Sequence, residues 1–293
     1  MDDMNEQNRT SLGRLLSDTG FRIKKHLGQN FLTDRNILEK IVREAGVTRE
    51  TYVIEIGPGL GSLTLPLSAA AKAVLAYEID PELIPILNEA IRNTDNVTVL
   101  NRDILKADID ADIQEHFRDA ANVIVVANLP YYITTPILMR FLETSKRVRR
   151  LVLMMQDEVA RRVTSNPSTK DYNALTVAIR YRADARYLFK VPRTVFVPEP
   201  NVDSAVVMVS IDRDREIHAI DDDIFNETVH RCFSQRRKTI INNLIDKNTI
   251  NSRTAWTEIL NRADIDPMCR AETLDVSDFV RLADAIRSSR VGK

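Results

Sequence analysis

The chain has 293 residues, of which 44% are hydrophobic and 28% charged, a composition typical of a globular protein with room for one large domain and a small one. The two cysteines, Cys232 and Cys269, form no CxxC pair, so we expect neither a disulfide nor a zinc site. No apolar run approaches membrane-spanning length, and residues 1–20 lack the apolar core of a signal peptide. We therefore expect a cytoplasmic protein without a membrane partner. The net charge of −1 argues at first against a nucleic-acid partner.

After a polar leader at 1–20, which we expect to be flexible, apolar strands alternate with amphipathic helices. A first helix over about 34–45 begins at Asp34 and places apolar residues at helical spacing. The predicted strands span 51–56, 73–79, 97–100, 123–127 and 151–155. The predicted helices between them span 62–71, 82–92 and 136–144. This alternation predicts parallel strands with helices on both faces of a sheet.

The pattern changes in the second half of the chain. Two late apolar runs, 187–191 and 205–211, are predicted to pair as an antiparallel edge, which gives a mostly parallel, seven-stranded sheet. Beyond an acidic connector near 212–222 only helices are predicted. These helices span about 224–233, 238–246, 254–263 and 277–288. The sequence therefore predicts an α/β domain over 21–211 and a small all-helical domain over 212–293.

A glycine-rich loop, EIGPGLG at 55–61, lies between the first of these strands and its helix. Glycines there let the backbone turn sharply and approach a ligand closely. The dinucleotide fingerprint G-x-G-x-x-G would need glycine at position 62, which is Ser62, so the match to a pyrophosphate-binding loop is imperfect. The pattern E-x-G-x-G-x-G instead resembles the first motif of class I S-adenosylmethionine methyltransferases.

Two acids follow the next two strands. Glu78 stands about 20 residues after Gly57, the spacing expected for an acid that accepts from ribose hydroxyls. Asp103 follows the third strand and is placed to accept from a cofactor's adenine amine, although such a residue taken alone is more often a turn cap. Because parallel strands meet at one carboxyl edge, the three features predict a nucleoside-binding crevice.

The tetrapeptide Asn128-Leu129-Pro130-Tyr131 ends the next strand at that same edge. If the side-chain carbonyl of Asn128 and the main-chain carbonyl of Leu129 accept from an exocyclic amine, its lone pair is freed to attack a methyl group. Pro130 stiffens the loop, and Tyr131 is placed to stack on an extruded base. These residues predict methylation of adenine N6, which needs no dedicated base because the proton leaves after methyl transfer.

A second aromatic residue, Phe196, precedes a loop with spaced prolines at 197–204. Taken alone it is best interpreted as a core anchor. Beside the tetrapeptide, we expect its ring to close over the other face of the adenine. The sequence offers no convincing nucleophile–base pair, since the four histidines (His26, His116, His218 and His230) are scattered and are better interpreted as surface or structural residues.

Basic residues are segregated along the chain. The stretch 140–162 contains seven Arg or Lys residues and three acids, and the stretch 180–193 contains five basic residues and one acid. Acids gather instead around 108–119 and 212–223. Such segregation can give a neutral protein the basic face that phosphate contact needs, although solvated helix faces explain it equally well.

Together these motifs resemble the bacterial 16S rRNA adenine N6,N6-dimethyltransferases, from about Phe21 to the C-terminus. The matching segments are LGQNFL at 27–32, IEIGPG at 54–59, NLPYY at 128–132, FVP at 196–198, NVDSA at 201–205 and FSQRRKT at 233–239. The resemblance implies a Rossmann-like class I methyltransferase fold with S-adenosylmethionine as the methyl donor. It also implies, as targets, two adjacent adenosines near the 3′ end of 16S rRNA in an assembling 30S particle, each methylated twice.

The resemblance also implies roles for individual residues. The residues implied to contact the cofactor are Asn30, Leu32, Gly57, Gly59, Glu78, Asp103 and Asn128. The residues expected to contact RNA are Lys24, Lys25, Arg236, Arg237 and Lys238, the last three because cations at the start of a predicted helix are disfavoured by its macrodipole and suit an external phosphate. Two departures from the family pattern are His26, where a small residue is usual, and Asn173, where glycine is common.

Three alternatives remain in view. The related 23S rRNA adenine dimethyltransferases of macrolide resistance share the cofactor and Asn-aromatic motifs, but the segments at 235–239 and 196–204 favour the 16S reading. A non-catalytic RNA-binding ribosome assembly factor would show degraded glycine or Asn-Leu-Pro-Tyr motifs, and both are intact. An NAD-dependent enzyme is disfavoured by Ser62 and by the lack of a hydride-transfer partner. We expect a monomeric enzyme.

Overall fold

The computed structural model describes residues 21–24, 28–118, 120, 122–213, 216–245 and 252–291. The chain divides into two compact units. One ends at Ala160 and resumes over Arg186–Ile211, and the other comprises Arg161–Ala185 and Asp212–Lys293. The predicted division at 211/212 differs from this one because residues 161–185 group with the helical unit, although they precede the last strands in sequence.

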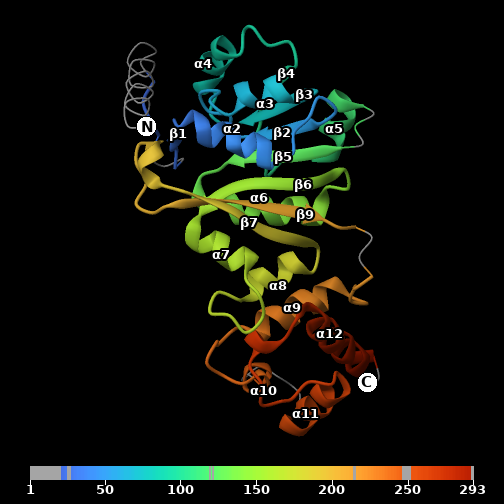
Figure 1. Cartoon of the computed structure of the whole chain (residues 1–293). Coiled ribbons are helices and arrows are strands. Elements are labelled where there is room, and N and C mark those ends of the chain that lie inside the picture. The colour runs from blue at the N-terminus through green and yellow to red at the C-terminus, as the bar shows by residue number, and fades with distance from the viewer. Residues whose placement is uncertain are drawn as a thin grey trace. The chain divides into compact units, whose positions relative to one another are not determined.

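A seven-stranded sheet organises the first unit (Figure 1). Its strands are β2 (Tyr52–Ile56), β3 (Ala73–Glu78), β4 (Val97–Asn101), β5 (Val123–Asn128), β6 (Val148–Gln156), β7 (Ala183–Val191) and β9 (Ser204–Ile211). The strand order is β4-β3-β2-β5-β6-β9-β7. Strands β2 to β6 pair in parallel, and β9 runs antiparallel to β6. The predicted α/β fold with a mostly parallel, seven-stranded sheet is therefore confirmed.

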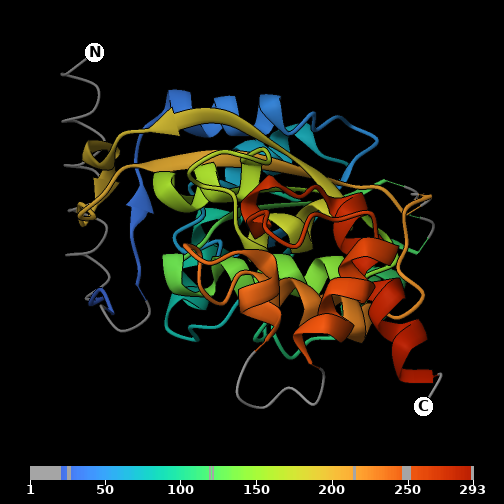
Figure 2. The ribbon, with the colours of Figure 1, turned by 90° about the horizontal axis from the view of Figure 1, so that it is seen from below.

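Helices cover both faces of this sheet, as the alternation of elements predicts. They are α2 (Arg35–Glu44), α3 (Thr64–Ala70), α4 (Leu83–Ala90), α5 (Ile109–Phe117) and α6 (Tyr131–Thr144). Helix α7 (Asp157–Thr164) follows β6 and contains the division between the two units. Helix α2 begins where the Asp34 carboxylate accepts from the main-chain N–H of Ile37 at 3.1 Å. Apolar side chains of α2 and α3 pack on one face, and α6 lies on the other (Figure 2).

A second, two-stranded sheet joins distant parts of the sequence. Strand β1 (Phe31–Leu32) pairs antiparallel with β8 (Phe196–Val197), with Leu32 opposite Phe196. The short helix η2 (Arg193–Val195) precedes β8, and its Val195 carbonyl accepts from the N–H and the hydroxyl of Thr33 at 3.0 and 2.9 Å. The N-terminal motif therefore lies directly against the Phe196 segment, which the sequence analysis does not predict.

The second unit is helical, with its own apolar core. Its elements are α8 (Ala174–Arg180), α9 (Asp222–Cys232), α10 (Ile240–Leu244), α11 (Arg253–Arg262), η3 (Ala271–Thr273) and α12 (Val276–Val291). Phe225, Trp256 and Phe279 are central to the core. Asn173 begins α8 by accepting from the N–H groups of the second and third helical residues, which accounts for an amide where glycine is common. Both cysteines are free.

The predicted helix starts at 136 and 238 are both wrong, since the first of these helices, α6, already begins at Tyr131. Helix α10 begins at Ile240, so the basic triplet Arg236, Arg237 and Lys238 lies in a turn between α9 and α10 and not in a first helical turn. The macrodipole argument for an anionic partner therefore does not apply to it. No helix in the described part of the chain is long and apolar enough to cross a membrane.

Candidate functional site

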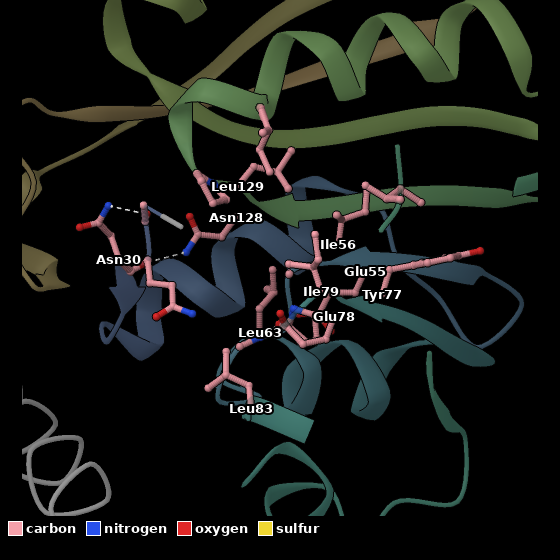
Figure 3. A pocket seen from close by; sticks show the side chains of 18 of the residues that line it. Asn30, Glu55, Ile56, Leu63, Tyr77, Glu78, Ile79, Leu83, Asn128 and Leu129 are labelled. Atoms are coloured by element: carbon pink, nitrogen blue, oxygen red, sulfur yellow. Dashed lines mark hydrogen bonds between the residues drawn. The ribbon is translucent and has the colours of Figure 1, made fainter. Parts of the chain in front are cut away.

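One cavity at the carboxyl ends of β2, β3 and β5 gathers the residues that the sequence analysis singled out (Figure 3). All the residues predicted to bind cofactor or acceptor line it: Asn30, Leu32, Gly57, Gly59, Glu78, Asp103, Asn128, Leu129, Pro130, Tyr131 and Phe196. These residues come from six separate stretches of the chain. The roles assigned to them remain predictions.

The glycine loop leaves space beside its backbone. Gly57, Gly59 and Gly61 have φ angles of 68°, 59° and 84°, which side chains other than glycine's rarely allow. A Cβ atom at Gly59 would lie 3.1 Å from the Phe31 ring, whereas one at Gly57 would meet only the Asn128 carbonyl, at 3.8 Å. The loop thus approaches the cavity with bare backbone, which suits a closely held ligand.

Glu78 is fixed in place before any ligand binds. Its Oε2 accepts from the main-chain N–H of Gly59 at 3.1 Å, and its Oε1 accepts from that of Asp80 at 2.8 Å. The side chain is 4% exposed, and burial raises its pKa although these two hydrogen bonds act to lower it. Each oxygen keeps a lone pair that can accept a ligand hydroxyl.

Glu55 is an acid that lines the cavity and is buried without a hydrogen bond to another described residue. It is 1% exposed, and neither of its carboxyl oxygens has a hydrogen-bond partner among the described residues. Burial raises its pKa to about 8; the Thr64 hydroxyl offsets part of this rise although it lies outside hydrogen-bond geometry. A buried acid of this kind, beside Glu78, suits a ligand that brings its own positive charge.

Asp103 fits both of its sequence interpretations. Its Oδ1 accepts from the main-chain N–H of Leu105 at 3.0 Å, as a turn cap does. Its Oδ2 lies 3.8 Å from Lys106 Nζ, and the side chain, 26% exposed, lines the cavity. Its position agrees with the predicted contact to a cofactor's adenine.

Asn128 is oriented by the N-terminal segment. Its Nδ2 group donates to the main-chain carbonyl of Asn30 at 3.3 Å, and the Asn30 side chain donates to the carbonyl of Gly28 at 3.0 Å (Figure 3). Because Nδ2 is held in this way, Oδ1 is the atom of the amide left to accept from a ligand. The main-chain contact thus sets the end of the amide that the predicted chemistry needs.

The two predicted aromatic walls differ in exposure. Tyr131 is partly buried, and its hydroxyl lies 2.8 Å from the Ser204 hydroxyl, which fixes the ring at the start of α6. Phe196 lines the cavity but is only 1% exposed and belongs to the core cluster that contains Leu32. Phe196 therefore packs in the core, as the first interpretation expects. Its predicted role of closing over the adenine remains a prediction. Tyr132, which the sequence analysis did not single out as a site residue, lines the cavity and is 60% exposed.

The basic residues predicted to contact RNA lie in different settings. Lys24 Nζ lies 2.8 Å from Asp80 Oδ1 and 3.0 Å from Glu82 Oε1, so its charge is paired with two acids of the same chain. Arg236 pairs with Glu272 at 3.1 Å and donates to the Lys170 carbonyl. Arg237 and Lys238 are exposed. Lys25 and His26 lie outside the described residues.

A partly buried network of hydrogen bonds supports the cofactor half and was missed by sequence reasoning. The Tyr77 hydroxyl donates to Asp112 Oδ2 at 2.8 Å, and Arg102 Nη1 lies 2.6 Å from Asp112 Oδ1. Tyr77 and Arg102 line the cavity and directly precede Glu78 and Asp103. Their adjacency to the two predicted acids is the only sequence signal that could have found them.

Known proteins match most of the length of this chain. The family model described as ribosomal RNA adenine dimethylase matches residues 20–282. The ribosomal RNA small subunit methyltransferase A of Bacillus pumilus is 46% identical over 277 residues, which cover 94% of this chain and 95% of that protein. The protein of the same name from Geobacillus thermodenitrificans is 46% identical over 275 residues, which cover 93% and 94%.

Two solved structures share the fold. A dimethyladenosine transferase from Plasmodium falciparum superposes with a TM-score of 0.72 at 25% identity, covering 89% of this chain and 98% of that one. The 23S rRNA methyltransferase ErmE superposes with a TM-score of 0.67 at 26% identity, covering 88% and 99%. The similarity therefore extends over both units of the chain.

Proposed function

Because the chain belongs to the ribosomal RNA adenine dimethylase family, we propose that its cavity brings S-adenosylmethionine together with an adenine of small-subunit rRNA. The protein is an S-adenosylmethionine-dependent rRNA adenine dimethyltransferase. The observation that carries this proposal is the division of one cavity into a half lined by carboxyl groups and a half lined by neutral acceptors and rings.

The carboxyl-lined half suits the methyl donor. When bound, S-adenosylmethionine supplies an electrophilic methyl group on a positively charged sulfur. Glu55, Glu78 and Asp103 would hold it, since a cationic ligand with ribose hydroxyls can satisfy the unpaired Glu55 and the remaining lone pairs of the other two carboxyl groups. The bare backbone at Gly57 and Gly59 allows the close approach that such a ligand needs.

The neutral half suits the acceptor amine. Asn128 Oδ1 and the Leu129 carbonyl accept the two N–H groups of adenine N6, which withdraws the nitrogen lone pair from the ring and stabilises the positive charge that develops there. The Asn30 carbonyl keeps the Asn128 amide turned the right way for this task. Tyr131, held by Ser204, stacks on the extruded base and offsets part of the cost of unstacking it.

The same groups serve two successive transfers. After the first transfer, N6 loses a proton to water and keeps one N–H, so one of the two acceptors still holds the amine for the second transfer. Neutral acceptors tolerate this change because they need no proton of their own. A dedicated base is unnecessary, since the methylated ammonium is far more acidic than the starting amine.

The target is the small subunit. Relatives that are 46% identical over nearly their full length are named small-subunit methyltransferases, whereas the sequence identity to the 23S enzyme ErmE is 26%. We assign as substrates two adjacent adenosines near the 3′ end of 16S rRNA, each methylated twice in a 30S particle or its precursor. The protein acts as a monomer in the cytoplasm, and its helical unit, with Arg237 and Lys238 exposed, contacts the RNA.

Labelled methyl transfer to purified subunits tests this function. Small and large ribosomal subunits from cells that lack the modification are incubated separately with the protein and radiolabelled S-adenosylmethionine. We expect label in the 30S rRNA and none in the 50S rRNA. Label in the 50S subunit alone would assign the chain to the 23S reaction, and label in neither subunit would favour a non-catalytic assembly factor.

A further inference from the structure

A buried carboxylate outside the predicted site residues joins the N-terminal segment to the cofactor half of the cavity. Asp80 follows β3, two residues after Glu78, and is 2% exposed. Its Oδ1 lies 2.8 Å from Lys24 Nζ and its Oδ2 accepts from Gln29 Nε2 at 3.0 Å, across sequence separations of 56 and 51 residues. A carboxylate buried this deeply requires such partners, so the fold commits Asp80 to this segment.

The charges of this cluster are mutually stabilised. Burial acts to raise the pKa of the Asp80 carboxyl, but hydrogen bonds from Lys24, the Glu82 N–H and Gln29 outweigh it and hold that pKa below its usual range. The hydrogen bond to Asp80 raises the pKa of Lys24. The Lys24 main-chain N–H also donates to Gln29 Oε1 at 2.8 Å, which closes a ring of contacts among three residues.

Apolar contacts hold the same segment beside the ion pair. Phe21 and Ile23 pack against a buried cluster of Phe31, Leu60 and Leu83. All three residues of that cluster also line the cavity. The segment therefore has an apolar anchor and an ionic one on the same side of the cofactor site.

The cluster reaches both halves of the site through main-chain groups. The Asp80 N–H donates to Glu78 Oε1 at 2.8 Å, on the cofactor side. Gln29, bound to the Asp80 carboxylate, is followed by Asn30, whose carbonyl accepts from Asn128 on the acceptor side. Asp80 thus contacts Glu78 through its main-chain N–H and, through its carboxylate, the segment that holds Asn128.

We propose that Asp80 is a positioning residue that, through Lys24 and Gln29, latches residues 28–32 against the cofactor cavity, and that this latched state is the one that binds S-adenosylmethionine. The identity of the ligand rests on the proposed function. If only the latched state binds, weakening the latch raises the apparent Kd by the inverse of the latched fraction. Saturating cofactor then restores the latched state, so kcat is spared.

Substitutions of Lys24 test the latch with the full-length protein. Lys24→Met removes the ion pair at a partly exposed position and leaves the Asp80 contacts to Gln29 and the Glu82 N–H. We expect it to raise the calorimetric Kd for S-adenosylmethionine about tenfold, while kcat on 30S particles at saturating cofactor stays within about twofold. Lys24→Arg, which keeps the charge, is expected to remain within about threefold of the wild type in Kd.

The matched control is Arg35→Met, which breaks an exposed ion pair with Glu39 on α2, where the two side chains are 84% and 51% exposed. It is expected to leave the Kd unchanged. The isosteric Asp80→Asn is expected to raise the Kd further than Lys24→Met, and its melting temperature shows whether the fold persists. An unchanged Kd in Lys24→Met, or a fall in kcat with unchanged Kd, would overturn the latch, as would an equal loss in Arg35→Met.

Hydrogen exchange separates the latch from the proposed function. In Lys24→Met without cofactor, the amides of residues 28–32 are expected to exchange faster than in the wild type, and saturating S-adenosylmethionine is expected to restore their protection. Equal exchange in the two proteins would overturn the latch even if methyl transfer were demonstrated. If the wild type bound no S-adenosylmethionine, the proposed function would fail, while the exchange difference without cofactor would still report on the latch.

Discussion

The two halves of the cavity differ in the kind of polar group they present. The cofactor half has three carboxyl groups, Glu55, Glu78 and Asp103, whereas the acceptor half, among the described residues that line it, has an amide, main-chain carbonyls and aromatic rings. Acidic groups therefore lie where a cationic donor is held, and neutral acceptors lie where an uncharged amine must be aligned.

The polar groups of the two halves also differ in how many hydrogen bonds they receive from the protein itself. Both Glu78 oxygens accept main-chain hydrogen bonds, while those of Glu55 have no partner among the described residues. In the acceptor half, Asn128 and Tyr131 are each held by one hydrogen bond and keep one face for the ligand. The comparison predicts that substitutions in the acceptor half reduce kcat and that those in the cofactor half raise the Kd for the methyl donor.

The largest expected effect is that of Asn128→Ala. Loss of one acceptor from the developing ammonium should lower kcat by about a thousandfold, with the Kd for S-adenosylmethionine within about threefold of the wild type. Methyl transfer to 30S particles and calorimetry measure the two quantities. The control is Asn122→Ala, since Asn122 is exposed and directly precedes β5, at the end opposite Asn128. It should change neither kcat nor the Kd for S-adenosylmethionine. Wild-type turnover by Asn128→Ala would contradict the acceptor role.

Glu78→Gln should act in the opposite sense. The amide accepts from only one of the main-chain N–H groups of Gly59 and Asp80 and turns its own N–H donors toward the other, so we expect the Kd for S-adenosylmethionine to rise about a hundredfold. At saturating cofactor, kcat should fall far less. The control is Glu89→Gln on α4, whose side chain is 69% exposed. A Kd that stayed at the wild-type value in Glu78→Gln would remove this residue from the cofactor half.

The uncompensated Glu55 should make stability depend on pH. Because burial raises its pKa from 4.5 to about 8, the folded protein keeps a proton that the unfolded chain releases, and the folded state loses stability as pH rises between these values. Glu55→Gln removes this penalty. Between pH 6 and 8, without cofactor, the free energy of unfolding of the wild type should fall by about 2 kcal/mol relative to the variant. Urea denaturation at the two pH values measures this change. An equal change in the free energy of unfolding for the wild type and Glu55→Gln would contradict the assignment.

The smallest expected effect concerns the hydroxyl pair of Tyr131 and Ser204. Tyr131→Phe keeps the stacking ring and Ser204→Ala removes its anchor, so each should lower kcat about fivefold and leave the Kd for the donor unchanged. If the bond between the two hydroxyls is the cause, the double variant should be no slower than either single one. Additive losses would show that the two residues act separately.

The sequence predicted the sheet and the cavity well because their signals are local. Buried parallel strands are continuous apolar runs, and polar residues just past such runs must meet at one edge of the sheet. Glu78, Asp103 and Asn128 could be placed together on this basis before any coordinates. Which ligand each one contacts is a further inference that position alone does not supply.

The remaining features depend on contacts between distant residues. The pairing of β1 with β8 involves two residues on each side, too few to show a periodicity, and it joins Leu32 to Phe196. Helix α5 lies in the acidic stretch 108–119, for which no helix was predicted, and α8 has only seven residues. The Lys24–Asp80 pair spans 56 residues, so a lysine in a basic stretch was assigned to RNA. Tertiary pairing overrides local composition in each case.

Nucleoside analysis of the reaction product tests the central claim most directly, because the claim concerns which atom the two halves bring together. 30S particles that lack the modification are incubated with the protein and isotopically labelled S-adenosylmethionine, and the rRNA is digested and analysed by mass spectrometry. The account predicts two labelled N6,N6-dimethyladenosines per particle, at adjacent positions near the 3′ end of 16S rRNA. Label on another nucleotide, or on an adenine atom other than N6, would contradict it.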